Sequence, residues 1–179
     1  MKRISKHLIF ILLLLVFQVA IISNLPFYLS HLNLILVCLM FLSVVYKFKL
    51  GIVYSFIFGV LLDIYSALPF GAYLIALTVT IYFAYKFFNQ FLTNKSVYSL
   101  IGLTALSTVI FNAIMYSYKV LFYYNNAREF FSFDLLLLWI KTDFIYQLVI
   151  NLIFVIVLFL AYNFTSNRFR AVFIDTTKQ

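Results

Sequence analysis

The sequence predicts an all-α, polytopic membrane protein with six transmembrane helices. Of the 179 residues, 66% are hydrophobic and only 10% are charged, whereas a soluble domain carries about 25% charged residues. The apolar residues form long runs that short polar or basic segments separate, so lipid must be the solvent over most of the surface. We expect one integral membrane domain over residues 1–179, with spans at approximately 7–24, 32–47, 50–67, 71–88, 97–122 and 139–163.

The first expected span, 7–24, follows a basic start that contains Lys2, Arg3 and Lys6. A basic start before an apolar stretch is also typical of a signal peptide. No small-x-small cleavage site follows this stretch, and Pro26 stands just beyond it. We therefore interpret it as an uncleaved transmembrane helix that ends before Pro26, because proline does not continue a helix.

The second and third expected spans, 32–47 and 50–67, are short compared with the roughly 17–25 residues that usually cross a bilayer. One alternative is that the two segments form a single re-entrant hairpin. Lys47 and Lys49 lie between them and would then sit within the membrane. Because charged side chains are costly there, we interpret the two segments as separate spans.

The remaining spans are longer or better separated. The fourth, 71–88, follows Pro69, and the fifth, 97–122, precedes the only sizeable loop of the sequence. The sixth, 139–163, begins at an expected interfacial turn around Trp139. Trp and Tyr are enriched where a helix leaves the bilayer, which agrees with this position for the tryptophan.

The basic residues predict the orientation. With six spans and both termini cytoplasmic, ten of the thirteen Lys and Arg residues lie inside: Lys2, Arg3, Lys6, Lys47, Lys49, Lys86, Lys95, Arg168, Arg170 and Lys178. Arg128 then lies outside, with Lys119 and Lys141 close to it. The positive-inside rule selects this orientation, and five or seven spans would break the pattern. We expect a multi-pass membrane protein with both termini in the cytoplasm.

Small residues and one acid form a stripe in the third expected span. Gly51, Ser55, Gly59 and Asp63 recur every four residues, so they share one face of a helix. Small residues at this spacing let a neighbouring helix approach closely. A carboxylate that faced lipid would cost about 2.5–3.5 kcal/mol. We therefore expect Asp63 to face protein or a wet cavity, roughly 18 Å along the helix from Gly51 and near the outer interface.

Further polar residues are expected in the same outer half of the membrane. They are Gln18 in the first span, the series Thr104, Thr108, Asn112 and Tyr116 with Lys119 one turn beyond in the fifth, and the series Asp143, Gln147 and Asn151 with Lys141 above it in the sixth. One interpretation is an outward-facing polar cavity between spans three, five and six, where Asp63 or Asp143 pairs with Lys119 or Lys141. Such a cavity could seat a partner helix, a lipid headgroup or a small solute.

The alternative is that these side chains make hydrogen bonds between packed helices, at roughly 0.6 kcal/mol each. We favour that interpretation for the Asn, Thr and Gln residues, and a special role for Asp63, because ionisable groups inside spans are rare. The candidate cavity residues are Asn112, Tyr116, Lys119, Lys141, Asp143 and Gln147.

No pattern for catalysis, cofactor binding or metal binding stands out. His7 and His31 lie apart from any acid–nucleophile pair and are expected to be interfacial. Cys38 is the single cysteine, so it has no internal disulfide partner and no metal-ligand neighbours. HExxH, glycine-rich phosphate loops and cysteine pairs are absent from the sequence. The net charge of +8 is divided among short runs between apolar segments, so it does not indicate nucleic-acid binding.

The segment Gly59-Val-Leu-Leu-Asp63-Ile-Tyr-Ser-Ala-Leu-Pro69-Phe-Gly71 resembles the hallmark of the rod shape-determining protein MreD family. That hallmark runs Gly, three apolar residues, Asp, then a small residue, Pro, one apolar residue and Gly. Family members usually have Gly in the place of Ala67. They often carry a Pro-Asp pair before the second span, where this chain has His31-Leu32-Asn33.

The resemblance implies a non-enzymatic inner-membrane scaffold of the cell-elongation complex of rod-shaped bacteria. Such a scaffold would bind MreC, link the filament MreB to the RodA glycosyltransferase, and so help to maintain cell shape and direct peptidoglycan synthesis. The family's fold is similar to the six-helix substrate-binding subunits of energy-coupling-factor transporters. The candidate partner-binding or structural residues are Gly51, Ser55, Gly59, Asp63, Pro69 and Gly71. A homo-oligomer is compatible with this interpretation.

A second function hypothesis is a transporter subunit that binds a small solute from outside. It explains a polar outer side equally well. Such subunits carry a small-residue stripe in the first helix, whereas the first span here, LIFILLLLVFQVAII, has Ala20 as its only small residue. This argues against docking of that kind. A third hypothesis, an intramembrane enzyme, lacks a candidate nucleophile and base.

Overall fold

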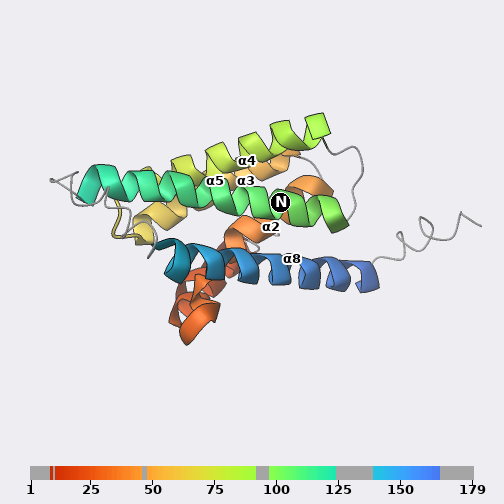
Figure 1. Ribbon diagram of the computed structural model, residues 1–179, viewed down its shortest axis with the longest axis horizontal. Helices are drawn as coiled ribbons and strands as arrows, with labels where there is room; N and C mark the ends of the chain where they lie inside the picture. Colours follow the sequence, from red (N-terminus) through yellow and green to blue (C-terminus); the bar gives the residue numbers. More distant parts are fainter. Residues whose placement is uncertain (1–8, 10, 46–47, 92–96, 124–138, 166–179) are drawn as a thin grey trace, which may run out of the picture.

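The computed structural model describes residue 9 and residues 11–45, 48–91, 97–123 and 139–165 (Figure 1). Six helices and no strand occur within these ranges, which confirms the predicted all-α class. In chain order they are the helix Ile11–Asn24, α2 (Leu34–Val45), α3 (Phe48–Tyr65), α4 (Ala72–Phe91), α5 (Val97–Tyr123) and α8 (Ile145–Thr165). A short 3-10 turn, Phe27–His31, precedes α2, and a π-helical turn, Ile140–Phe144, precedes α8.

Four helices, α3, α4, α5 and α8, are long and apolar enough to cross a membrane. The first helix and α2 are apolar but have only 10–17 residues each. The coarser prediction of a helical, multi-pass membrane protein is therefore confirmed, while six complete spans stay a prediction. Lys47, on which the choice between two spans and a re-entrant hairpin partly depended, lies outside the described residues.

Helix α2 lies in the protein core. Its residues Ile35, Leu36, Val37, Leu39 and Met40 are all fully buried, so nearly every face of the helix meets protein. The helix lies between α8 and the layer formed by α3, α4 and α5 (Figure 1). A helix that is hydrophobic all round is expected in such a place. Sequence alone could not distinguish this burial from exposure to lipid.

The long helices pack in chain order, α3 against α4, α4 against α5, and α5 against α8 (Figure 1). Phe58 of α3 is fully buried among them, with Leu77 and Ile81 of α4 and Leu103 of α5. The end of α3 and the start of α4 meet at one end of this bundle. The end of α5 and the start of α8 come to the same end, where residues of all four helices line one cavity.

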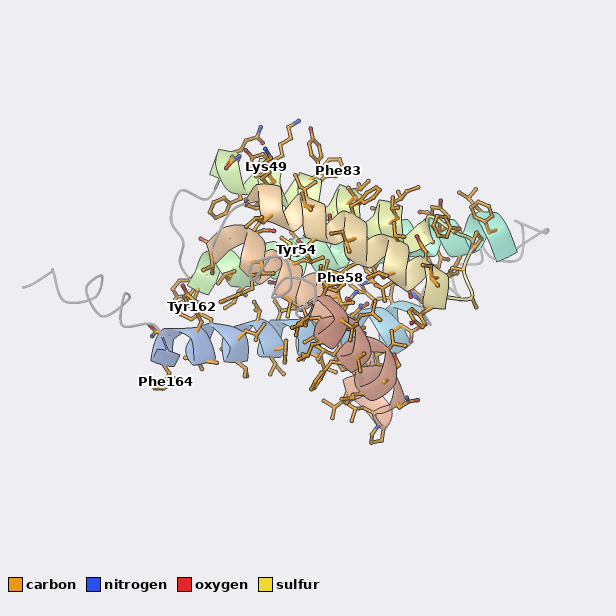
Figure 2. The ribbon with its side chains drawn as sticks, turned by 180° about the vertical axis from the view of Figure 1, so that it is seen from behind. Lys49, Tyr54, Phe58, Phe83, Tyr162 and Phe164 are labelled. Atoms are coloured by element: carbon orange, nitrogen blue, oxygen red, sulfur yellow. The ribbon has the colours of Figure 1, made fainter. Side chains whose placement is uncertain are left out.

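The outer surface of the bundle is apolar. Figure 2 shows Phe83 and Phe164 pointing outward, and these side chains are 49% and 88% exposed. Ile153 and Val157 on α8 are more than half exposed as well. Contiguous apolar patches of this extent are rare on soluble monomers. The surface therefore agrees with lipid as the surrounding solvent.

The first helix is irregular over its second half, and an uncleaved spanning helix at this place stays a prediction. It turns into a π-helical segment at Phe17–Ile21 and a 3-10 segment at Ile22–Asn24, and it projects away from the bundle (Figure 1). Two side chains bond back to the main chain here: Ser23 Oγ donates to the Gln18 carbonyl at 2.9 Å, and Asn24 Nδ2 donates to the Ala20 carbonyl at 2.9 Å. Such bonds offer the backbone groups an alternative to regular helix.

Candidate functional site

The carboxylate of Asp63 caps the N-terminus of α4. Its Oδ2 accepts hydrogen bonds from the backbone N–H groups of Gly71 at 3.0 Å and Leu74 at 3.2 Å, and its Oδ1 accepts one from Tyr73 at 2.8 Å. The first N–H groups of a helix have no partner within the helix, and they carry partial positive charge. Asp63 is only 4% exposed. One acid near the end of α3 thus satisfies three donors at the start of α4.

The turn between the two helices has the shape that this cap needs. Gly71 has a φ of +102°, a conformation that side-chain-bearing residues rarely adopt. Its N–H reaches Asp63, and its carbonyl accepts the N–H of Ile75 at 2.9 Å. The carbonyl of Pro69 accepts the N–H of Ala72 at 3.2 Å. Proline and glycine therefore fix the turn that brings the α4 amides onto the carboxylate.

The small residues of α3 allow two neighbouring helices to approach closely. A Cβ atom at Gly59 would lie 2.5 Å from the Cα of Leu74 and 3.0 Å from its backbone nitrogen, so the α4 main chain fills that place. A Cβ atom at Gly51 would overlap the Oγ of Ser43 on α2 and lie 3.1 Å from its Cβ. Ser55, between the two glycines, is fully buried. The stripe therefore faces α4 at one end and α2 at the other.

These contacts correct one hypothesis from the sequence. Asp63 was a candidate partner of Lys119 or Lys141, but its carboxylate accepts hydrogen bonds from the main chain around the start of α4. The α4 amides reach the carboxylate because the turn after α3 is short. We name the unit formed by α3, the turn and the start of α4, residues 51–74, the clasp.

A second helix start, that of α2, is capped by neutral amides from three segments. Gln18 Oε1 accepts the N–H of Leu34 at 2.8 Å, and Gln18 Nε2 donates to the Leu32 carbonyl at 3.2 Å. Asn33 Oδ1 accepts the N–H of Leu36 at 3.1 Å. The side chain of Asn151, on α8, accepts the N–H of Asn33 at 3.0 Å. The two side-chain oxygens of residues 18 and 151 thus tie the first helix and α8 to α2.

The predicted polar series of α5 joins this network. Asn151 Nδ2 donates to Thr108 Oγ1 at 3.1 Å, and both residues are fully buried. Thr108 Oγ1 donates to the Thr104 carbonyl at 2.8 Å, and Asn112 Nδ2 donates to the Thr108 carbonyl at 2.8 Å. These bonds match the interpretation of the Thr and Asn residues as hydrogen bonds between and along packed helices.

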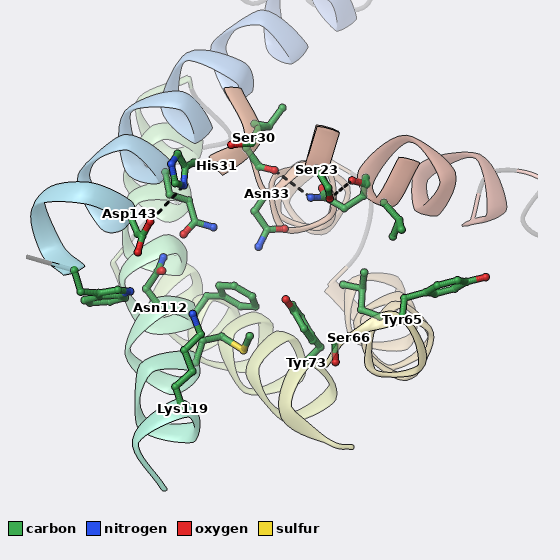
Figure 3. A pocket seen from close by; sticks show the side chains of 18 residues that line it. Ser23, Ser30, His31, Asn33, Tyr65, Ser66, Tyr73, Asn112, Lys119 and Asp143 are labelled. Atoms are coloured by element: carbon green, nitrogen blue, oxygen red, sulfur yellow. Dashed lines mark hydrogen bonds and ion pairs between the residues drawn. The ribbon is translucent and has the colours of Figure 1, made fainter. Parts of the chain in front are cut away.

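A polar cavity of about 420 Å³ opens beside the clasp (Figure 3). Four of the six candidate cavity residues line it, namely Asn112, Lys119, Asp143 and Gln147. The other two, Tyr116 and Lys141, are not among the lining residues. The ring of Tyr116 packs against Trp139 with centroids 4.8 Å apart, and Lys141 is exposed. Asp63 does not line the cavity either, because α4 encloses its carboxylate.

The sequence argument missed the contribution of residues 18–33 and of α4 to this cavity. Gln18, His31 and Asn33 line it from one side, and Tyr73 lines it from the start of α4. The positions of these four side chains depend on packing between segments far apart in the chain, and the periodicity of the sequence does not predict such packing. Only the polarity of Gln18 within an apolar run marked one of them in advance.

Asp143 has a different partner from the lysines considered for it. His31 Nδ1 lies 3.9 Å from Asp143 Oδ1, and the His31 ring stacks on Tyr146 with centroids 6.1 Å apart. His31 is therefore close to an acid, although the sequence placed it as an isolated interfacial histidine. The pair connects the turn before α2 with the start of α8. In the described part of the chain, no three His, Cys, Asp or Glu residues lie together as metal ligands would.

Comparison with known families gives one result. The family model described as rod shape-determining protein MreD matches residues 1–165, a range that includes all the described helices. No curated protein and no solved structure matches the chain at a significant level. The expected similarity to the substrate-binding subunits of energy-coupling-factor transporters therefore stays a prediction.

Proposed function

Since the chain belongs to the rod shape-determining protein MreD family, we propose that it is a non-enzymatic scaffold of the cell-elongation complex. Family membership makes it a membrane protein of rod shape determination, and its four long apolar helices suit a multi-pass protein of the inner membrane. Within that role we propose that it binds MreC. Through MreC it would connect MreB to RodA and so direct peptidoglycan synthesis.

The family match over residues 1–165 is the observation that carries this proposal. The clasp supports it, because residues of the hallmark hold the end of α3 against the start of α4. Gly59, Asp63 and Gly71 each have a contact that explains their identity. We propose that the hallmark residues act by holding α3 and α4 together, and that partner binding depends on the surface that this pair forms.

The orientation proposed here places both termini in the cytoplasm and the cavity on the outer side. Lys49 stands at the start of α3 and Lys86 near the end of α4, both at the end of these helices remote from the turn that joins α3 to α4. Lys119 and Lys141 stand at the cavity end. The other nine basic residues, eight of them assigned to the cytoplasmic side, lie outside the described residues. A cysteine-accessibility experiment at positions 86 and 119 tests this orientation.

Depletion of the protein in its rod-shaped host tests the function itself. We expect the cells to become round and to recover when the wild-type chain is supplied. A tagged chain should co-purify MreC from solubilised membranes. Normal rods after complete depletion would contradict the scaffold role. If a variant still co-purifies MreC at the wild-type level but does not restore rod shape, its defect lies in a step that follows MreC binding.

The cavity favours a second candidate, a transporter subunit that binds a small solute. Its volume of about 420 Å³ is within the range of small-molecule sites. This candidate predicts that a small molecule co-purifies with the chain and is released on denaturation, where mass spectrometry can identify it. It also predicts loss of uptake of that molecule after depletion, with cell shape unchanged.

A further inference from the structure

Three hydrogen-bond donors converge on the cavity from different elements. Figure 3 shows the Lys119 side chain turning back toward the cavity, the Tyr73 hydroxyl directed into it, and the Asn33 amide approaching from the opposite side. Lys119 has no carboxylate of the described residues within 4.0 Å. Asn33 Oδ1 accepts the Leu36 N–H, which leaves its NH₂ group for the cavity. The arrangement offers donors to an acceptor-rich ligand.

The start of α2 adds positive potential at the same place. No acidic residue occurs in the first turn of α2, and the groups that cap it are neutral amide oxygens. Its partial positive charge is therefore not neutralised, whereas a carboxylate neutralises that of α4. Helix N-termini with free charge favour anions, although the site here depends on the lysine and the cavity together.

Negative charge around the cavity is small. Of the two described acids, Asp63 does not line the cavity, and Asp143 lines it beside His31 at 3.9 Å. Within the described part of the chain, no carboxylate therefore forms an ion pair with Lys119. A ligand with two negatively charged oxygens would receive a charge-assisted bond from Lys119 and further bonds from Tyr73 and Asn33.

The size and the apolar part of the lining indicate what else the ligand carries. A volume of about 420 Å³ exceeds the need of a bare phosphate, and the apolar side chains of Leu62, Phe111, Met115 and Trp139 are among the residues that line the cavity. We propose that this cavity binds a phosphate ester, with the phosphate at Lys119, Tyr73 and Asn33 and the carbon portion against these apolar side chains. A phospholipid headgroup and a soluble phosphate ester share this chemistry. The proposal does not depend on the scaffold function.

The test uses the full chain purified in neutral detergent. Phosphatidylglycerol and diacylglycerol with the same acyl chains are added, and native mass spectrometry counts the bound molecules while scanning fluorimetry records the unfolding midpoint. We expect phosphatidylglycerol to bind and to raise the midpoint, and diacylglycerol to do neither. Glycerol 3-phosphate forms a separate arm. Binding of the lipid alone identifies a headgroup as the source, and binding of glycerol 3-phosphate identifies a soluble ester.

Paired variants locate the binding. Lys119→Gln should weaken phosphate-ester binding about tenfold, since it removes the charged donor, and Lys86→Gln, an exposed lysine at the other end of the molecule, should leave it unchanged. Tyr73→Phe should weaken binding a few-fold, and Tyr98→Phe, which is highly exposed, should not. Equal binding of phosphatidylglycerol and diacylglycerol, without binding of glycerol 3-phosphate, would overturn the proposal. The proposal would also be overturned if Lys119→Gln and Lys86→Gln changed binding equally and Tyr73→Phe and Tyr98→Phe did so as well.

Discussion

The N-termini of α4 and α2 are both capped by side chains, but the capping groups differ: a carboxylate at α4 and neutral amides at α2. Each helix begins inside the protein, where its first N–H groups need acceptors. Helix α4 receives a single charged carboxylate from Asp63, which precedes it in the same hairpin. Helix α2 receives neutral oxygens from Gln18, Asn33 and Asn151, which come from three parts of the chain.

The two caps therefore differ in how far apart in the sequence their donors and acceptors lie. The Asp63 cap and the close approach of Gly59 to Leu74 both lie within the clasp, so their sequence pattern can be recognised without knowing the rest of the fold. The α2 cap exists only after the first helix and α8 have packed, because Asn33 and Asn151 are 118 positions apart. A change in the clasp should therefore disturb one hairpin, and a change in the α2 cap should disturb contacts among several helices.

The largest effect is expected for Asp63→Ala. This change leaves three partly buried N–H groups without their charged acceptor and should cost about 3 kcal/mol or more, because bonds to charged groups contribute roughly 1.5–3 kcal/mol each and are not additive. Asp63→Asn keeps one oxygen acceptor and should cost less. Thermal unfolding in detergent measures both, and Asp175→Ala in the C-terminal tail is the control. A wild-type midpoint for Asp63→Ala would contradict the cap.

Gly59→Ala should come next. The new Cβ would lie 2.5 Å from the Leu74 Cα, so the two helices must separate, at a cost of about 1–3 kcal/mol. Gly102→Ala is the matched control, because a Cβ there meets nothing within 4 Å. That change should be neutral or stabilising by up to about 1 kcal/mol, since alanine is the better helix former. Equal midpoints for the two variants would show that α3 and α4 do not approach closely at Gly59.

Asn151→Leu tests the cap at the start of α2. It removes the acceptor of the partly buried Asn33 N–H and the donor to the fully buried Thr108 hydroxyl. We expect a loss of about 1–2 kcal/mol, because the bonds are neutral but leave buried groups unsatisfied. Asn163→Leu, at an exposed position of the same helix, should leave the unfolding midpoint near that of the wild type. If both variants unfold alike, the amide network does not stabilise the start of α2.

The smallest effect is expected for Gly71→Ala. A side chain at a φ of +102° is strained, which should cost about 1 kcal/mol. The nearest atom to the new Cβ, the Tyr118 hydroxyl, is 3.7 Å away, so space is not the obstacle. The variant should unfold at a lower temperature than Gly102→Ala. An equal midpoint would mean that the turn adopts another conformation.

Local patterns predicted the parts of the fold that depend on neighbours in sequence. Apolar runs indicated helices in a membrane, and the spacing from Gly51 to Asp63 indicated a stripe that meets other helices. The polar series of α5 and α8 indicated a cavity, and four of its expected residues line one. None of these signals showed that Asp63 bonds to α4 rather than to a lysine, because a cap depends on how far the following turn bends.

The remaining features depend on packing between distant segments. Nothing in the apolar run of α2 distinguishes burial in protein from exposure to lipid, since both favour the same residues. The contact between His31 and Asp143, and the place of Gln18 against Leu34, arise only when the first helix, α2 and α8 meet. Sequence periodicity describes single helices and therefore gives no information about these pairs.

Hydrogen exchange at the start of α4 tests the cap most directly. The amides of Gly71, Tyr73 and Leu74 donate to Asp63, and mass spectrometry of peptides covering residues 68–76 follows their exchange in detergent. We predict slow exchange in the wild type and much faster exchange in Asp63→Ala, while peptides from the middle of α5 keep their protection in both. Unchanged exchange of residues 68–76 in Asp63→Ala would contradict the cap and with it the explanation of the hallmark.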